Sequence, residues 1–246
     1  YTSSNGLVIK VSGSGELLQT NILSDRPGLA QRDATGNFYF AGLLPGQFYG
    51  EGYHYDDPAC FLLKYSADGT LVSSNSFGPV GNLRADGDGP NFTFGDLQLD
   101  SDGNAYVAYW FPITTHSHNS YASKLNVSGS NVWTSLLPQA SGPFDAFRGA
   151  VRFGPISPTG VYAIEYVVNA GRSYATLSRF DNAGVATVVT GWVAAGNNQP
   201  LYASPAGDTQ GNWWEIEGVE LVKRSAGGAL LWSRDVGDDT LWTVAG

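Results

Sequence analysis

The sequence predicts an all-β chain assembled from repeated four-stranded units, and three observations lead to this prediction. A short apolar stretch, a cation and a glycine five residues later recur along the 246-residue chain. A box of the form Asp-x-x-Gly-Asn, followed by alternating aromatic and small residues, lies between successive copies of that frame. No segment has a sustained 3.6-residue apolar period, and 32 glycines with 12 prolines interrupt the chain too often for long helices.

The cation frame predicts one hairpin in each repeat. Its cations are Lys10, Lys64, Lys124, Arg179 and Lys223, and its glycines are Gly15, Gly69, Gly129, Gly184 and Gly228. Each apolar strand leads through a turn of Ser, Asp or Gly into a second strand, such as 70–73 or 230–233. Because the cations repeat at one strand position, we expect a structural contact to a turn carbonyl or a neighbouring Asp, and not an anion-binding ring.

The Asp-Gly box predicts a second hairpin in each repeat. Its copies begin at Asp33, Asp100, Ser157 and Asp208, and the third departs from the pattern with Ser157 for Asp and Val161 for Asn. Asp bonds its own backbone and Gly accepts a positive φ, so the box is a tight-turn signal flanked by strands. Repetition at one turn explains these aspartates structurally and argues against a catalytic role for them.

Two hairpins per repeat make four strands, and four short strands recurring every roughly 45 to 60 residues are typical of a β-propeller blade. We expect one domain over residues 1–246 with about five blades. The first residues lead straight into a lysine strand, while 238–246 supply an opening strand without its lysine partner. The N- and C-terminal strands are therefore expected to close the ring; the alternative is a fragment of a larger propeller.

The order of these boxes resembles the secreted bacterial β-propeller repeat family. The shared pattern is Asp-x-x-Gly-Asn-aromatic, then apolar-apolar-Lys-x-x-x-x-Gly, then apolar-Trp-Ser, and it covers nearly the whole chain. The resemblance implies the architecture and a secreted or cell-surface location. It implies no particular chemistry, because such repeats are scaffolds in adhesins, surface proteins and proteins of other roles.

Composition narrows the range of partners. A net charge of −9 with 13 basic residues argues against nucleic acid or an anionic membrane as a partner. No apolar run approaches the ~20 residues of a membrane-spanning helix. The single cysteine, Cys60, precludes an internal disulfide, and we expect it to be buried in a strand.

Turn lengths predict which face of the disc carries function. In a blade with strands A to D, the A–B and C–D turns lie on one face, and the B–C and D–A connections lie on the other. The first set is tight throughout, and the second holds the insertions 43–59, 74–95, 109–120 and 136–148. Long loops on a rigid scaffold commonly carry binding sites, so the long-loop face is the predicted functional face.

The insertions are rich in aromatic and polar residues, which suits a sugar ligand. An aromatic ring offers its face to the C–H surface of a pyranose, while Asp, Asn and His bond its hydroxyls. The candidate ligand-binding residues are Tyr49, Tyr53, Tyr55, Asp56, Asp57 and Trp110. The alternative is that these rings pack the long loops onto the disc.

All three histidines, His54, His116 and His118, fall within these insertions. A His-x-His pair, with His54 or Asp56 as a third ligand, has a spacing that suits zinc or copper. The alternative is loop histidines in solvent. Apart from this metal hypothesis, the sequence predicts no cofactor.

The sequence therefore favours an extracellular, non-catalytic binding or adhesion module whose partner is a glycan or another extracellular protein. One alternative is a structural subunit of an extracellular assembly. The other is a propeller glycosidase or lyase that draws its acid and base from Glu51, Asp56, Asp57 and Asp96. Against catalysis, the sequence has no Gly-x-Ser-x-Gly elbow, phosphate-cradling loop or dinucleotide fingerprint.

Overall fold

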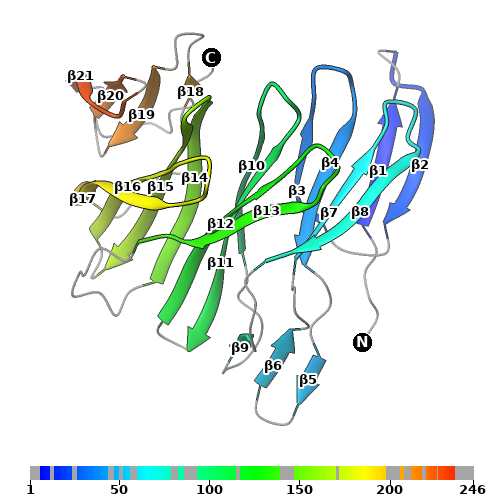
Figure 1. Cartoon of the computed structure of the whole chain (residues 1–246), viewed down its shortest axis with the longest axis horizontal. Coiled ribbons are helices and arrows are strands. Elements are labelled where there is room, and N and C mark those ends of the chain that lie inside the picture. Colours follow the sequence, from blue (N-terminus) through cyan, green and yellow to red (C-terminus); the bar gives the residue numbers. More distant parts are fainter. Residues whose placement is uncertain are drawn as a thin grey trace.

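The protein is all-β, as predicted (Figure 1). A computed structural model describes residues 6–11, 14–23, 27–43, 47–49, 52–55, 60–78, 83–85, 93–114, 117–138, 147–169, 172–197, 206–207, 212–217, 220–225 and 227–235. All regular secondary structure in these segments is β-strand. No helix in the described part of the chain is long and apolar enough to cross a membrane.

Four antiparallel sheets of four strands each make up most of the described structure. Blade 1 contains β3 (Pro27–Arg32), β4 (Phe38–Leu43), β7 (Cys60–Tyr65) and β8 (Leu71–Phe77). Blade 2 contains β10 (Thr93–Leu99), β11 (Ala105–Thr114), β12 (Ser117–Leu125) and β13 (Asn131–Leu136). Blade 3 contains β14 (Phe147–Ser157), β15 (Gly160–Asn169), β16 (Arg172–Phe180) and β17 (Ala186–Asn197). Blade 4 contains β18 (Ala206–Gly207), β19 (Trp213–Glu217), β20 (Glu220–Arg224) and β21 (Leu230–Asp235).

The blades are arranged as in a β-propeller. The first strands of neighbouring blades contact one another, β3 with β10, β10 with β14 and β14 with β18, so they form the inner edge of the array. A fifth sheet contains β1 (Gly6–Val11) and β2 (Leu17–Leu23), which form the first cation-frame hairpin. It lies at the opposite end of the array from β21 (Figure 1). The predicted ring closure depends on residues 238–246, which lie outside the described residues.

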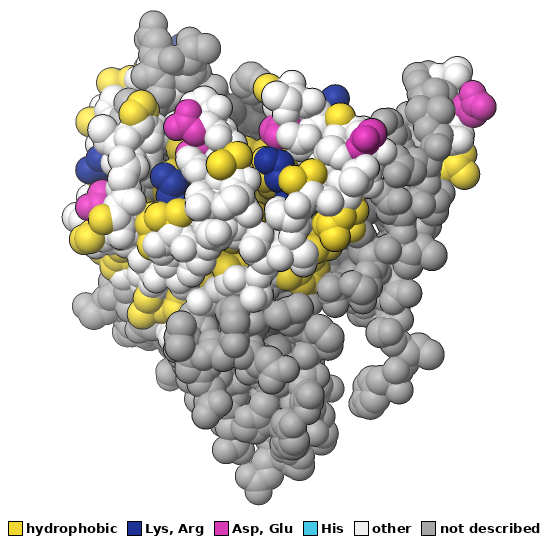
Figure 2. Space-filling model, turned by 45° about the vertical axis from the view of Figure 1, so that its right-hand side comes forward, with side chains coloured by type: hydrophobic (Ala, Val, Ile, Leu, Met, Phe, Trp, Pro, Cys, Tyr) yellow, Lys and Arg dark blue, Asp and Glu magenta, His cyan; other side chains and the backbone are white. Residues whose placement is uncertain are grey.

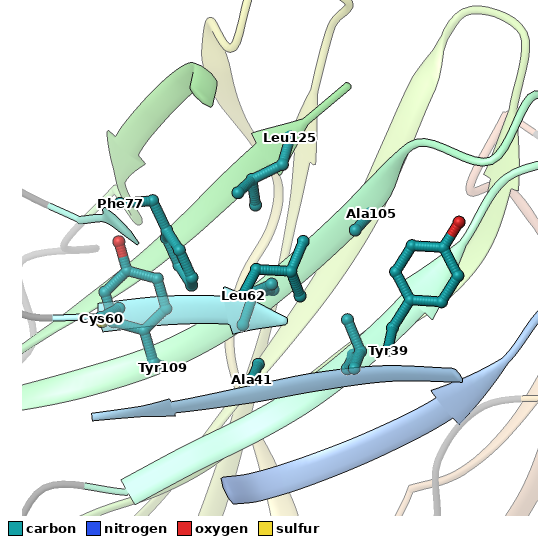
Figure 3. Close-up of a cluster of buried hydrophobic side chains, with 10 residues drawn as sticks. Tyr39, Ala41, Cys60, Leu62, Phe77, Ala105, Tyr109 and Leu125 are labelled. Carbon is teal, nitrogen blue, oxygen red and sulfur yellow. The ribbon is translucent and has the colours of Figure 1, made fainter. Parts of the chain in front are cut away.

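Apolar contacts between blades form the core. One cluster joins Tyr39, Leu62 and Phe77 of blade 1 to Tyr109 and Leu125 of blade 2, all nearly inaccessible to solvent (Figure 3). A second cluster joins blade 2 to blade 3. Cys60 belongs to the first cluster and is fully buried in β7, as predicted, and burial raises the pKa of its thiol. A blade without neighbours would expose these apolar side chains to water, so each blade depends on its neighbour for stability.

The predicted turn chemistry is confirmed. The five frame glycines have φ between 80° and 89°, a region that residues with a Cβ atom rarely occupy. In the Asp-Gly boxes, Asp33 accepts hydrogen bonds from the backbone N–H groups of Thr35 (3.0 Å) and Asn37 (2.8 Å). Asp100 accepts the equivalent bonds in blade 2. Desolvation is the largest single influence and raises the pKa of Asp33, but the hydrogen bonds from Thr35 and Asn37 together outweigh it and lower the pKa to about 2.

The repeated cations pair with the repeated aromatic residues. Lys64 lies 5.0 Å from the ring centroid of Tyr39, Lys124 lies 5.1 Å from that of Tyr106, and Lys223 lies 4.5 Å from that of Trp214. Each cation is the direct cross-strand partner of its ring. This contact links the two boxes within one blade, and a cation over an aromatic face is worth about 0.5–1 kcal/mol at a partly exposed site.

Lys64 and Arg179 make carbonyl contacts of the predicted kind. The Lys64 ammonium donates to the carbonyl of Val127 (3.5 Å), and the Arg179 guanidinium donates to that of Thr159 (2.9 Å). The cations therefore have a structural role.

The frame glycines also let neighbouring blades approach closely. A Cβ atom at Gly184 would lie 2.7 Å from the indole of Trp133 in the preceding blade, and one at Gly129 would collide with the side-chain amide of Asn75. The Trp133 ring cannot yield, because it is buried and stacked on Phe180 at 5.6 Å. These glycines thus serve both the turn and the packing of blade on blade.

Gly184→Ala is expected to lower the free energy of unfolding by at least about 1 kcal/mol more than Gly103→Ala. Both substitutions carry the cost of a Cβ atom at positive φ, about 1–2 kcal/mol, but a Cβ at Gly103 would meet its nearest neighbour, Val127, at an ordinary 3.4 Å. Urea denaturation of both variants measures the difference. Equal losses would show that close packing makes no separate demand at Gly184.

Candidate functional site

The long insertions of blade 1 join in a small sheet of their own. This sheet has the order β5 (Gln47–Tyr49), β6 (Gly52–Tyr55) and β9 (Leu83–Ala85), so the predicted insertions 43–59 and 74–95 pair with each other. It lies beyond the blade ends opposite the tight turns (Figure 1), and β9 contacts β11. The insertion sheet, as we call β5–β6–β9, thus gives the long-loop face an ordered element.

The strand register of the insertion sheet shows which candidate residues share a face of the sheet. Position 53 pairs with Phe48 and Ala85, position 54 pairs with Gln47 and Arg84, and position 55 pairs with Leu83. Alternate positions of a strand belong to the same face of a sheet. Tyr53 and Tyr55 therefore occupy one face and His54 the other.

Tyr49 is the partner of Gly52 at the end of the β5–β6 hairpin. Asp56 and Asp57 follow β6 directly and lie outside the described residues, as does Glu51.

The predicted insertion at 109–120 is wrong. β11 continues to Thr114 and β12 begins at Ser117, so most of this segment is an extension of the blade 2 hairpin. The alternation of small and aromatic residues persists through it and favours continued strand pairing. Trp110 lies within β11 and is only 7% exposed, so its ring packs inside the protein and does not present a face to solvent.

The histidines are distributed over two elements. His54 lies in β6, His118 lies in β12 opposite Pro112, and His116 is outside the described residues. Within the described segments, no group of three or more His, Cys, Asp or Glu residues is placed to hold a metal ion. The metal hypothesis remains a prediction, because it depends on His116.

A buried polar cluster lies between blades 2 and 3 and was missed by the sequence reasoning. The Ser120 hydroxyl donates a 2.5 Å hydrogen bond to Glu165, whose side chain is completely buried in β15. Trp110 pairs with Ser120 across β11 and β12, and Thr176 pairs with Glu165 across β15 and β16. Cross-strand partners share a sheet face, so the hydrogen bond brings all four residues to one interface. The sequence signal for this buried cluster is Glu165, the single acidic residue within the apolar stretch 161–168.

Asp96, a sequence candidate for an acid or base, connects blade 2 to blade 3. Its carboxylate accepts hydrogen bonds from the backbone N–H groups of Phe153 and Leu97, both at 2.9 Å, and from the Gln98 amide at 3.1 Å. Burial raises the pKa of Asp96, while these bonds and the nearby Arg152 charge act in the opposite direction. This geometry is that of a structural link between β10 and β14.

The comparisons with known proteins give structural similarities and no sequence family. No protein-family model matches the chain, and no curated protein matches it. A subtype N10 neuraminidase-like protein of A/little yellow-shouldered bat/Guatemala is similar in structure, with a TM-score of 0.47 and 11% identity, over 92% of this chain and 74% of that one.

Two further solved structures are similar. An alpha-L-arabinofuranosidase from Lactobacillus brevis has a TM-score of 0.43 and 12% identity, over 82% of this chain and 68% of that one. A PL25 polysaccharide lyase, an ulvan lyase, has a TM-score of 0.40 and 8% identity, over 79% of this chain and 50% of that one. We infer no chemistry from these similarities.

Asp96→Asn and Asp33→Asn are expected to change the pH dependence of stability in opposite directions. The pKa of Asp96 is raised in the folded state. Between the ordinary value of 3.8 and the raised value, the folded state therefore binds more protons than the unfolded state. In this pH range, Asp96 makes the free energy of unfolding fall as the pH rises. The lowered pKa of Asp33 makes stability fall as the pH drops from 3.8 towards about 2.

Urea denaturation across a pH series measures both effects. Relative to wild type, Asp96→Asn should gain stability as the pH rises from about 4 to 7, and Asp33→Asn should gain as it falls from about 4 to 2. Parallel profiles for wild type and Asp96→Asn would contradict the proposed environment of Asp96.

Proposed function

We propose that the protein is an extracellular, non-catalytic binding module of the secreted bacterial β-propeller repeat type, and that its ligand is a glycan bound at the insertion sheet. The observation that carries this proposal is the pairing of two separate insertions into one ordered sheet at the end of blade 1. The four-stranded sheets of blades 3 and 4 form in the described residues without such an added sheet. An added ordered element on a rigid scaffold is a common place for a binding site.

The residues of the insertion sheet support a sugar ligand. Tyr53 and Tyr55 occupy alternate positions of β6, opposite Phe48 and Leu83, so one face combines aromatic and aliphatic positions. Asp56 and Asp57 follow at once in the sequence. Aromatic residues beside carboxylates match the alternating apolar and hydroxyl surfaces of a pyranose.

The non-catalytic part of the proposal is supported by the geometry of the described carboxylates. Asp96 bonds to β14, Glu165 bonds to Ser120 between blades, and Asp33 and Asp100 cap turns. Each of these groups has a role in folding that accounts for its position. The low share of charged residues, 14%, and the resemblance of the repeats support a secreted or cell-surface location.

A structural subunit of an extracellular assembly is the second candidate, and the outer strands favour it. Their first residues expose aliphatic side chains in successive blades, among them Leu71 and Val72 in β8, Val132 in β13 and Leu230 in β21. Such positions suit contacts with another protein.

A glycan array probed with the purified chain tests the proposed function. We expect selective binding that Tyr53→Ala and Tyr55→Ala each weaken by at least about tenfold, because stacking on an aromatic ring is lost. Trp232→Ala is the matched control, since it removes an exposed aromatic residue from blade 4 and should leave binding unchanged. Thermal unfolding of each variant checks that the fold persists.

Binding should also survive EDTA, and an EDTA-sensitive signal would instead support the histidine metal hypothesis. The proposal fails if no glycan binds, or if both tyrosine variants bind as wild type does. Release of a cleaved sugar product would contradict the non-catalytic assignment.

A further inference from the structure

The insertion sheet carries a row of hydrogen-bond donors across all three of its strands. Gln47 of β5 pairs with His54 of β6, and His54 pairs with Arg84 of β9. Directly opposed residues share a face of a sheet and neighbours along a strand do not, so this row lies on the face opposite that of Tyr53 and Tyr55. The donor row, as we call Gln47, His54 and Arg84, combines an amide, an imidazole and a guanidinium, each of which can donate hydrogen bonds.

The composition of the two insertions makes this row unusual. Arg84 is the only Lys or Arg residue within 43–59 and 74–95, and His54 is the only histidine there. Strand pairing nevertheless places these two residues directly opposite each other. Like charges at opposed positions destabilise a sheet, so this pair is unfavourable when His54 is protonated. A bound anion would replace that repulsion with two attractions.

Negative charge is not supplied by the same face of the insertion sheet. Its other described positions are Tyr49 and Gly52, which pair with each other at the end of the β5–β6 hairpin. Among the described residues of this sheet, no carboxylate therefore shares a face with Arg84. The blades differ in this respect: on the side shown in Figure 2, Lys and Arg side chains lie among Asp and Glu side chains and form no separate basic patch.

We propose that the donor row binds the carboxylate or sulfate group of an acidic glycan. In an antiparallel sheet, the Cα atoms of directly opposed residues lie about 4.5–5.5 Å apart, so one anionic group can reach both Arg84 and His54. The planar guanidinium matches two oxygen atoms of such a group, and Gln47 extends the row towards a neighbouring sugar hydroxyl. Because the net charge of −9 repels a polyanion at long range, its binding depends on a local cation such as Arg84.

This inference rests on the proposed function in one respect, because a sugar carries the anion, and it adds the chemical class of that sugar. It does not require the charged sugar residue to contact Tyr53 or Tyr55, since these tyrosines lie on the other face of the sheet. The effect of the donor row and the effect of the tyrosines can therefore be measured separately.

A glycan array with matched neutral, uronic-acid and sulfated forms of the same hexose oligosaccharides tests this proposal. Titration of the purified chain over the array gives an affinity for each form. We expect at least one acidic form to bind at least about tenfold more tightly than its neutral counterpart, because charge-assisted hydrogen bonds are about twice as strong as neutral ones. Comparison of the uronic-acid and sulfated forms identifies the anionic group.

Substitutions in the donor row should remove this preference. Arg84→Gln should lower the affinity for the acidic form by at least about tenfold and leave the neutral form unaffected, because it removes the charge. Arg84→Lys should retain part of the preference, because lysine keeps the charge without the planar fork. Arg234→Gln is the matched control, since it removes an exposed arginine from blade 4 and should change no affinity. Thermal unfolding of each variant checks that the fold persists.

The outcomes separate this inference from the proposed function. Equal affinities for neutral and acidic forms would overturn the inference and leave the glycan proposal standing, as would an acidic preference that Arg84→Gln and Arg84→Lys both leave unchanged. An acidic preference that is lost in Arg84→Gln and kept in Tyr53→Ala would support the donor row and contradict stacking on Tyr53. An array without any bound oligosaccharide would overturn both proposals.

Discussion

The arrangement of the blades depends on one contact, the seating of a turn glycine on the outer strand of the preceding blade. The turn requires glycine because its φ is near 80°. The contact between blades also requires glycine, because a side chain there would overlap Trp133 or Asn75. Once the turn is seated, Trp133 stacks on Phe180 of the next blade and the buried residues of β11 and β15 come together. The close approach of the turn to the outer strand therefore sets the distance between neighbouring blades, on which the core packing depends.

The sequence predicted the features that depend on neighbours along the chain. Turn glycines, capping aspartates such as Asp33, and the strands on either side follow from local chemistry. Contacts between strands were harder to predict, because they depend on register. Nothing local indicated that Lys124 faces Tyr106, or that Ser120 meets Glu165 across two blades. Trp110 was placed in a loop because the length of its hairpin differs between blades: β4 and β7 have 6 residues each, whereas β11 and β12 have 10 and 9.

Polar groups divide into two populations with different environments. Inside the array, Asp96, Glu165 and Ser120 bond across the interface of blades 2 and 3, where low solvent access makes each bond directional and costly to break. Tyr49, Tyr53 and Tyr55 of the first insertion lie in the insertion sheet, beyond the blades. Substitutions in that sheet leave the residues of the interblade bonds unchanged, so the proposed glycan site can be tested separately from the packing of the blades.

The pairing of Lys64, Lys124 and Lys223 with an aromatic ring inside their own blade has a consequence for how the molecule is made. Both boxes of a blade are close in sequence, so the strand pairs of each sheet can begin to form soon after their residues leave the ribosome, although the sheet becomes stable only when a neighbouring blade covers its apolar face. Docking onto the finished predecessor then follows in chain order. A duplicated or deleted repeat would leave this assembly route intact, so the number of blades can change during evolution while the design of each blade persists.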